Sequence, residues 1–512
     1  MTATQEVSAT PLVLGPAATS RVRRWLRFSL TDILFIGILV WGVILSPNGW
    51  SRLLLDADTG LHIRIGNFIL QNGVVPTTDP LSFTRNGSHW LATEWLTGAM
   101  FSFLNMYFGL KGVVFVCGVA IAATFAVVLR TCITTGANCF LSLIFVLMAT
   151  NASSFHFHAR PHVFTWLFLA ISMHVLARDV SHPTGQIWWL VPLTAVWANL
   201  HGGYAVVFAV LGIFVAGSAF EEGYRSPRVI RYTMLAAGCG MASLLNPFGY
   251  NLPLETLRYL HDSNIQNSIQ EFAAPDFRTE SQMYFMGLLF AGLAVAGLLV
   301  TKRRYTQTLL LIAFGYLALT SVRHIPIYAI VAVPVIVREL SSIWSEWVGR
   351  QPPKSTAAVL DEMSLAANDR MLPISLWSLA GLSAILVFSA RSSWPKDFPS
   401  DRFPTEIAAR DSARLASSRL FTTDQWADYL MFKNPAQRVF LDDRSLYDPK
   451  IIADAHTLMD AGPGWKQLID KYQIGSVLVP VETSLASALT EDRHWTLTDQ
   501  NSNSRLFQIV VP

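Results

Sequence analysis

The chain is poor in charge for its length. Only 14% of its 512 residues are Asp, Glu, Lys or Arg, whereas about 25% is usual in a soluble domain. Hydrophobic residues make up 52% of the chain, and its mean hydropathy is +0.38. This composition excludes an ordinary soluble protein and predicts a polytopic membrane protein. The net charge of +3 is too small to favour a nucleic-acid partner.

A disulfide framework and a cleavable leader are also missing from the sequence pattern. The four cysteines lie in or beside hydrophobic stretches and form no C-x-x-C pair, so neither disulfides nor a zinc site are predicted. Residues 1–20 lack the pattern of a cleaved signal peptide. We therefore expect the first hydrophobic stretch to remain as a signal anchor.

The predicted span interiors have almost no ionisable side chains. His174 is the main exception, and a single His inside a helix bundle is expected to be a hydrogen-bonded packing residue. Ion-coupled transporters usually need buried carboxylates or broken helices near the middle of the membrane. The pattern therefore argues against a proton or sodium pump.

Hydrophobic stretches of suitable length predict about eleven membrane spans. They are residues 30–48, 112–130, 138–152, 160–177, 186–200, 202–220, 228–246, 282–300, 305–321, 324–342 and 372–390. A further stretch, 91–109, is expected to lie along the outer surface as a juxtamembrane helix. If it spanned, the basic segments 221–231 and 302–304 would lie outside, against the positive-inside rule.

The same rule orients the chain. Four arginines precede the first span, so segment 1–29 is predicted to be cytoplasmic. The transmembrane domain then covers 30–391 and has two external loops, 49–111 and 247–281. Residues 392–512 are expected to form an extracytoplasmic soluble α/β domain. There, strand-like runs (RVFLDD, SVLVPV, SRLFQIVV) alternate with helix-like runs (TTDQWADYLMF, GWKQLIDKY).

Polar residues gather at one set of predicted helix ends. On this topology the outward-facing turns carry Asp56, Asp58, His62, Arg64, Glu94, His156, His158, Arg160, His162, Asn199, His201, Tyr204, Asn246, Glu271, Asp276, Arg323 and His324. The opposite turns carry mostly the positive charge that orients the helices. This asymmetry predicts an outward-facing active site at the membrane interface.

Asp56 and Asp58 follow the first span directly, in the run LDADTGLHIR. Carboxylates at the membrane surface can activate an acceptor hydroxyl, bind a divalent metal such as Mg²⁺ or Mn²⁺, or meet a lipid phosphate. The alternative is a solvated loop that caps the next helix.

Three other motifs each leave two interpretations open. The histidines of FHFHARPH suggest a metal site, but Arg160 in their midst would repel a metal and favours interfacial hydrogen bonding. The turn WANLHGGY is either functional or a tight connection in which Gly202 and Gly203 take positive φ. Arg323 is either an interfacial anchor or a bidentate phosphate ligand.

Several segments resemble the GT-C superfamily of membrane glycosyltransferases, in a bacterial branch. They are DADTGLHIRIGNFILQNGVVPTTDPLSF, TEWL, WANLHGGY, NPFGY, QEFAAPDF and VFLDDRSLYD. The resemblance implies an α-helical polytopic fold with juxtamembrane helices and a terminal soluble domain. It also implies transfer of a sugar from a polyprenyl-phosphate-linked donor to a glycan or protein acceptor, outside the bacterial cytoplasmic (inner) membrane. No W-W-D-type motif is present, which argues against protein N-glycosylation.

The resemblance implies a base for the acceptor and cations for the donor phosphate. Asp56 and Asp58 are the catalytic candidates, or one of them is a metal ligand. The predicted substrate-binding residues are His62, Arg64, Glu94, Arg160, His162, Asn199, His201, Tyr204, Asn246, Glu271, Arg323 and His324. Two alternatives remain open: a non-catalytic lipid or glycan transporter, and a scaffold for envelope assembly.

Overall fold

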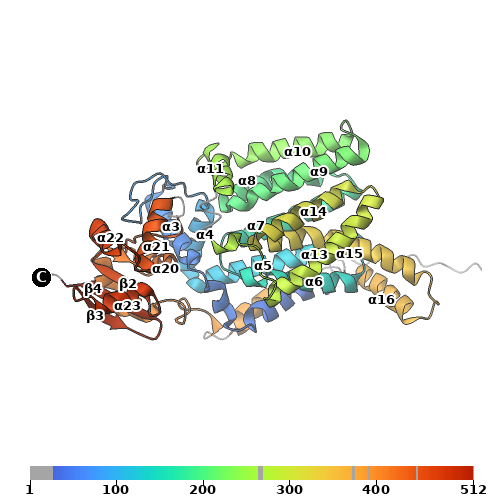
Figure 1. Cartoon of the computed structure of the whole chain (residues 1–512). Coiled ribbons are helices and arrows are strands. Elements are labelled where there is room, and N and C mark those ends of the chain that lie inside the picture. The colour runs from blue at the N-terminus through green and yellow to red at the C-terminus, as the bar shows by residue number, and fades with distance from the viewer. Residues whose placement is uncertain (1–26, 263–268, 372–374, 390–392, 445–447, 511–512) are drawn as a thin grey trace, which may run out of the picture.

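The computed structural model describes residues 27–262, 269–371, 375–389, 393–444 and 448–510. A bundle of long helices carries a smaller α/β domain at one end (Figure 1). Helices α3 (Asp58–Asn72) and α4 (Trp95–Phe108) lie between the two. We call the bundle end that meets the α/β domain the domain end, and the opposite one the far end. Of the predicted segment 1–29, residues 1–26 lie outside the described residues.

Six helical segments among the described residues are long and apolar enough to cross a membrane. They are Leu110–Thr134 (α5), Cys139–His156 (α6 and η3), His162–Ser181 (α7), Gly202–Glu222 (η5 and α9), Glu280–Thr301 (α13) and Val322–Val348 (η7 and α15). Shorter helices fill the other predicted spans: α2 (Leu30–Gly37) with η1 (Ile38–Ile44), η4 (Gly185–Trp189) with α8 (Leu190–Leu200), α10 (Pro227–Ser243), α14 (Tyr305–Thr320) and α17 (Trp377–Phe388). The chain has the composition of a membrane protein, and the count of about eleven spans stays a prediction.

Close approach and local hydrogen bonds hold the bundle together. At Gly292 of α13 a Cβ atom would lie 2.1 Å from the hydroxyl of Tyr328, so only glycine permits this contact between α13 and α15. His174 behaves as the packing residue that the sequence predicted, since its Nδ1 lies 3.0 Å from Oγ1 of Thr131. Helix α16 (Thr356–Met371) lies at the far end, away from the α/β domain (Figure 1).

Helices α3 and α4 pack against each other at a point where each has a glycine, Gly66 and Gly98. A Cβ atom on Gly66 would lie 1.9 Å from the carbonyl oxygen of Gly98. The predicted amphipathic helix near 60–71 is therefore present as α3. Helix α4 has 14 residues and a length of about 21 Å, which is short of the roughly 30 Å hydrocarbon core. Its length favours the predicted surface position of 91–109.

The second predicted external loop, 247–281, contributes two short helices at the domain end. They are α11 (Asn251–His261) and the 3₁₀ helix η6 (Gln270–Phe272). Helix α11 lies toward the domain end of the bundle (Figure 1).

The α/β domain contains a four-stranded sheet in the order β1-β2-β4-β3. Its strands are β1 (Leu420–Phe421), β2 (Ser476–Pro480), β3 (Trp495–Gln500) and β4 (Ser504–Ile509). Strand β1 runs parallel to β2, and β4 is antiparallel to both β2 and β3. The surrounding helices are α18 (Thr405–Arg410), α19 (Ser412–Ala416), α20 (Asp424–Lys433), α21 (Pro449–Met459), α22 (Trp465–Tyr472) and α23 (Ser484–Glu491).

Most of the elements expected in this domain are present. The runs SVLVPV and SRLFQIVV form β2 and β4, and the two helix-like runs form α20 and α22. The run RVFLDD forms only isolated bridges at Val439. The sequence missed β3, because most of that edge strand is exposed and carries little apolar signal.

The first external loop is part of the α/β domain's framework. Ser82 bridges Val439, which in turn bridges Leu420 of β1. The amide of Phe83 donates to the carbonyl of Val439 at 3.0 Å, and the hydroxyl of Thr84 donates to the carbonyl of Phe440 at 2.5 Å. The loop thus extends the edge of the sheet although it comes from the other end of the chain.

Candidate active site

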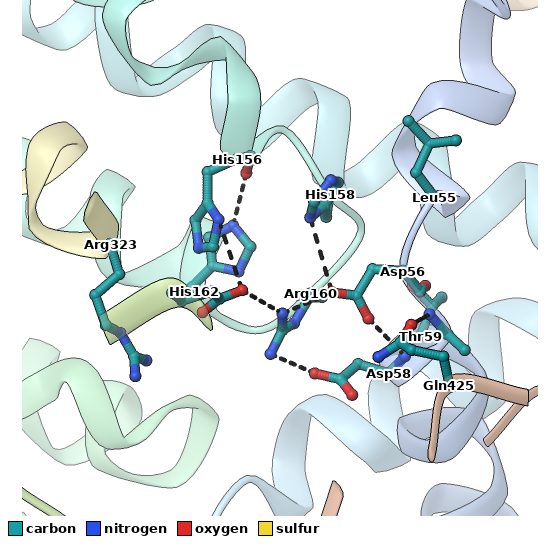
Figure 2. Close-up of polar contacts among 12 residues, drawn as sticks. Leu55, Asp56, Asp58, Thr59, His156, His158, Arg160, His162, Arg323 and Gln425 are labelled. Atoms are coloured by element: carbon teal, nitrogen blue, oxygen red, sulfur yellow. Dashed lines mark hydrogen bonds and ion pairs between the residues drawn. The ribbon is translucent and has the colours of Figure 1, made fainter. Parts of the chain in front are cut away.

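Arg160 lies at the centre of a group of three carboxylates (Figure 2). One terminal nitrogen, Nη1, lies 2.7 Å from Asp56 and 2.8 Å from Glu271, and the other pairs with Asp58. The four residues come from the start of the first loop, from the turn between α6 and α7, and from the second loop. Four predicted site residues thus meet at the domain end.

Backbone contacts fix the turn that carries Arg160. The amide of Ala159 donates to the carbonyl of Leu53 at 2.7 Å, and Thr59 Oγ1 donates to the carbonyl of Ala159 at 2.8 Å. His162 donates from Nε2 to the carbonyl of His156 at 3.0 Å. The contact made by His162, a predicted substrate ligand, is therefore with its own turn.

Asp56 and Asp58 differ in exposure and in partners. Asp58 opens α3, and its amide donates to Oδ1 of Asp56 at 3.0 Å. The Asp56 side chain is 13% exposed and that of Asp58 is 6% exposed. Burial raises the pKa of Asp58 to about 6, even though Arg160 opposes this shift. His158 lies beside the pair, with Nδ1 3.9 Å from Asp56.

Glu94 forms a second polar group with two histidines. Its carboxylate lies 3.3 Å from Nε2 of His62 and 3.4 Å from Nε2 of His201. The amide of Gly203 donates to Nδ1 of His201 at 3.0 Å, which places the ring proton on Nε2, facing Glu94. Burial raises the pKa of Glu94 to about 7 and lowers the pKa of both histidines to about 3.

The expectation of positive φ at the His-Gly-Gly turn was wrong. Gly202 and Gly203 lie in the 3₁₀ helix η5 (Gly202–Ala205), and neither has positive φ. Gly203 is needed for space, because a Cβ there would lie 2.6 Å from both Nδ1 of His201 and Oγ1 of Thr165. The turn therefore holds His201 against its neighbours.

Arg323 brings a second guanidinium to the domain end. It donates to the hydroxyl of Tyr259 at 3.2 Å and stacks over Phe272 at 4.6 Å. Among the described residues, no carboxylate lies within ion-pair distance of Arg323. Burial opposes ionisation of Glu271, but Arg160 and Arg323 outweigh it and lower its pKa to about 2. In Figure 2, Arg323 lies on the opposite side of Arg160 from the Asp56–Asp58 pair.

Three predicted binding residues make structural contacts instead of joining either group. Arg64 donates to the carbonyl of Pro435 in the α/β domain at 2.9 Å. Asn199 accepts from Nε1 of Trp95 at 2.8 Å and joins α8 to α4. Asn246 closes its own NPFGY turn, accepting from the amide of Phe248 at 2.7 Å.

Tyr204, His324 and Asp276 also lie apart from the two polar groups. Tyr204 is buried and packs edge-on against Phe208. Nδ1 of His324 lies 3.1 Å from the carbonyl oxygen of Leu317. Asp276 is exposed and accepts from the amide of Arg278 at 3.2 Å.

The Asp56–Asp58 pair does not fit a metal between its carboxylates. Arg160 occupies that position, and the other oxygen of Asp56 accepts from the amide of Asp58. Asp428 and Asp443 of the α/β domain present carboxylate oxygens to Asp58, all within 4.8 Å of one another. The sequence pointed to the turn of Asp442, Asp443 and Arg444 as one that could face a ligand, but it gave no role to Asp428. Only the place of Asp428 on the predicted helix TTDQWADYLMF, one turn after another acid, offered a signal.

The chain is similar to known proteins in its structure but not in its sequence. No family profile and no curated protein matches its sequence. Its structure is similar to that of an oligosaccharyltransferase from Archaeoglobus fulgidus tethered to an acceptor peptide, with a TM-score of 0.57, 11% identity, and coverage of 88% of this chain and 69% of that one. The chain has the GT-C fold.

Two further GT-C structures are similar to it. The Archaeoglobus fulgidus oligosaccharyltransferase AglB, in complex with an inhibitory peptide and a dolichol-phosphate, has a TM-score of 0.56 and 12% identity over 88% of this chain and 69% of that one. ArnT from Cupriavidus metallidurans, bound to undecaprenyl phosphate, has a TM-score of 0.46 and 11% identity over 93% of this chain and 97% of that one. At 12% identity the comparison with AglB shows a shared fold and nothing more.

Proposed function

We propose that the chain is an integral membrane glycosyltransferase that moves a sugar from a polyprenyl-phosphate-linked donor to an acceptor on the extracytoplasmic side of the bacterial cytoplasmic membrane. The observation that carries the proposal is the group at the domain end. There, a carboxylate pair and two guanidinium groups lie where an apolar bundle meets a polar domain. A lipid-linked phosphate sugar needs that combination of apolar and polar surroundings.

Arg323 is the proposed ligand of the donor phosphate. The leaving group in this reaction is an anionic phosphate, which is stabilised by positive charge and hydrogen-bond donors. Arg160 is already shared by three carboxylates, whereas Arg323 has only a tyrosine hydroxyl and an aromatic ring as described partners. A guanidinium also offers two parallel donors to a phosphate. Arg323 lies in η7 (Val322–His324), directly before α15, where a lipid tail can remain against the bundle.

Asp56 is the proposed base for the acceptor hydroxyl. It is the more exposed member of the pair, and Arg160 and the amide of Asp58 hold its carboxylate in place. The hydroxyl proton passes to Asp56 as the acceptor oxygen attacks the anomeric carbon and the bond to the lipid phosphate breaks. Asp58 assists by orienting Arg160. Because a metal does not fit between the two carboxylates, no step is assigned to one there.

The acceptor is proposed to approach from the side of the α/β domain. Arg85, His89 and Trp90 of the first loop and Glu255, Arg258 and His261 of α11 line an open cleft of about 530 Å³. The cleft lies between the first loop and the second, outside the polar groups described above. Its mixed charge and its indole suit a polar acceptor with hydroxyl groups.

Turnover by the purified chain tests the proposal. The protein in nanodiscs is given radiolabelled undecaprenyl-phosphate-linked sugars and an extract of envelope glycans, and transfer is followed by chromatography. We expect transfer from at least one lipid-linked donor and none from the matching nucleotide sugar. A protein that moves lipid-linked sugar between leaflets without breaking the phosphate bond is a transporter and contradicts the proposal.

Cysteine labelling tests the orientation separately. A cysteine at position 303, in the turn between α13 and α14, is predicted to be cytoplasmic, and one at position 470, on α22, extracytoplasmic. A membrane-impermeant maleimide applied to intact cells should then label position 470 and not 303. Labelling of position 303 alone would invert the layout.

A further inference from the structure

Three carboxylates from distant parts of the chain converge between the bundle and the α/β domain. Asp58 comes from the first turn of α3, Asp428 from the middle of α20, and Asp443 from the segment after Val439. Each offers an oxygen, and the three oxygens lie within 4.8 Å of one another. The group stands beside the Arg160 site and shares Asp58 with it.

These carboxylates are buried without enough partners. Asp428 is fully buried, and neither of its oxygens has a hydrogen-bond partner among the described residues. The Oδ1 atom of Asp58 also lacks a partner, while its Oδ2 pairs with Arg160. A buried carboxylate without partners is strongly disfavoured, so something must compensate for Asp428.

The nearby guanidinium groups are committed elsewhere. Arg160 is shared among Asp56, Asp58 and Glu271. Arg444 donates to Asp442 and, at 2.7 Å, to Asp79, and it stacks over Trp90. Arg160 pairs with Asp58 through Oδ2 only, and neither arginine hydrogen-bonds to Asp428.

The spacing of the oxygens matches a hard divalent cation. Ca²⁺ binds oxygen ligands at 2.3–2.6 Å, so ligands on opposite sides of it lie about 4.6–5.2 Å apart. For Mg²⁺ at 2.0–2.1 Å the corresponding separation is about 4.0–4.2 Å. Three oxygens that lie within 4.8 Å of one another can all contact one such ion, and Ca²⁺ accepts the flexible geometry of an all-protein site more readily than Mg²⁺, which demands near-ideal octahedral geometry. Asp443 is only partly buried, which leaves a route for the ion to enter.

We propose that Asp58, Asp428 and Asp443 bind one Ca²⁺ ion, which joins the first external loop to the α/β domain. The free Oδ1 of Asp58 is the ligand, so the same carboxylate links the ion to Arg160. The proposal concerns a structural cation and does not depend on the chain transferring a sugar.

Tight packing holds the ligands of this site in register. A Cβ atom on Gly60 would lie 2.9 Å from Cβ of Phe432 and 3.1 Å from the carbonyl oxygen of Asp428, so α3 and α20 touch backbone to backbone. The amide of Ala57 donates to Oε1 of Gln425 at 2.9 Å. The ion would therefore close an interface that is already preformed, and removing it should loosen the α/β domain from the bundle.

Metal binding by the full chain in nanodiscs is the test. The protein is stripped with EGTA, and binding of Ca²⁺, Mg²⁺ and Mn²⁺ is measured by equilibrium dialysis with elemental analysis. We expect one Ca²⁺ per chain, bound more tightly than Mg²⁺. Tb³⁺ is used as a luminescent probe of the same site, because Trp426 lies two residues from Asp428 and can sensitise it. Protease cutting within residues 393–404, just before α18, should be faster after stripping and should slow again with Ca²⁺.

Conservative variants make the test specific. Asp428→Asn and Asp443→Asn should each weaken Ca²⁺ binding at least ~10-fold, and Asp470→Asn, an exposed acid on α22, should leave it unchanged. Asp443→Asn serves if Asp428→Asn fails to fold. The proposal is overturned if the stripped protein binds no Ca²⁺ and both variants are as stable as the parent or more so, since the carboxylates would then share protons. Tighter binding of Mg²⁺ would overturn the choice of ion.

Discussion

The two ends of the bundle handle buried charge differently. At the far end, two of the described buried acids pair with basic residues, and a third, Asp32, accepts hydrogen bonds from the hydroxyls of Ser29, Ser375 and Ser378. Glu339 contacts Lys302 at 2.9 Å and also pairs with Arg304, and Asp179 receives a forked contact from Arg231 at 2.7 and 3.1 Å. These pairs are complete, and they serve the helix connections.

At the domain end the pairing is incomplete. Arg160 serves three acids, Arg323 has no described acid, and Asp428 has no described partner at all. Glu94 faces two histidines whose pKa is lowered to about 3, so they are neutral at pH 7. Groups left unsatisfied in a folded protein are where ligands are expected. The difference between the ends therefore separates charge used for structure from charge held ready for chemistry.

The largest expected effect comes from the proposed base. Asp56→Asn should lower sugar transfer by roughly 10²–10⁴-fold, the range typical of general-base loss, while the protein still folds, because the amide retains the shape of the carboxylate. The matched change at the far end, Asp179→Asn, should leave turnover per folded molecule unchanged. Initial rates at saturating donor measure both. Near-parental turnover in Asp56→Asn would remove this residue from the mechanism.

Removing the guanidinium group of Arg160 should make the domain end unfold before the far end. Arg160→Ala leaves three carboxylates without their shared partner, which should cost about 3–5 kcal/mol. Arg231→Ala strands a single acid and should cost less. Thermal unfolding in nanodiscs, followed separately by one spectroscopic probe on α20 and another on α10, compares the two. Equal losses would show that the ends do not differ in this way.

Arg323 should affect the donor and not the fold. Arg323→Ala should weaken donor binding by about 1.5–3 kcal/mol, the worth of a hydrogen bond between charged groups. Arg323→Lys should recover only part of this, because a lysine cannot reproduce the planar fork. Donor saturation kinetics give the result, with Arg304→Lys at the far end as control. Parental kinetics in both Arg323 variants would make this residue a membrane anchor.

Glu94 should make stability depend on pH in a defined direction. Its pKa is raised to about 7 from 4.5, so its neutral form is favoured by folding. The stability it contributes is fully present below about pH 4.5 and is lost as pH rises through 7. The loss is at most about 3 kcal/mol, and less in practice because a quarter of the side chain, 26%, is exposed.

The corresponding variant sharpens this last point. Glu94→Gln should reduce the dependence of the melting temperature on pH between pH 4.5 and 8. At pH 8 the variant should melt at a higher temperature than the parent. Glu222→Gln, at a half-exposed far-end acid paired with Arg228, is the control and should leave the parent's pH profile in place. If Glu94→Gln keeps the parent's profile, the pH dependence of stability arises elsewhere.

The gathering of polar residues at one end could be predicted from sequence, because it follows from counting spans and helix ends. The choice of partners could not. Asp56 and Arg160 are 104 residues apart, and nothing local indicates that the arginine takes the place between the two carboxylates. The sequence did show that Arg160 would repel a metal from the histidines.

The proposed cation site could not be predicted from the sequence for the same reason. Asp428 lies 370 residues beyond Asp58 on an ordinary amphipathic helix, and Asp443 follows a run that was expected to be a strand. Local patterns predict α3, α20, β2 and β4 because each has its own periodicity. Contacts among them depend on how the elements pack, for example on the absence of a side chain at Gly60. Such packing cannot be predicted from the sequence of any single segment.

The pairing of the first loop with the last domain determines when the candidate site can form during biosynthesis. Arg444 lies 365 residues after its partner Asp79. Ribosomes add about 5–20 residues per second, so roughly 20–70 s pass between the synthesis of Asp79 and that of Arg444. During that interval the emerging chain has a bundle but no completed site. On the proposed function, the site is therefore complete only after the final domain has docked against the bundle.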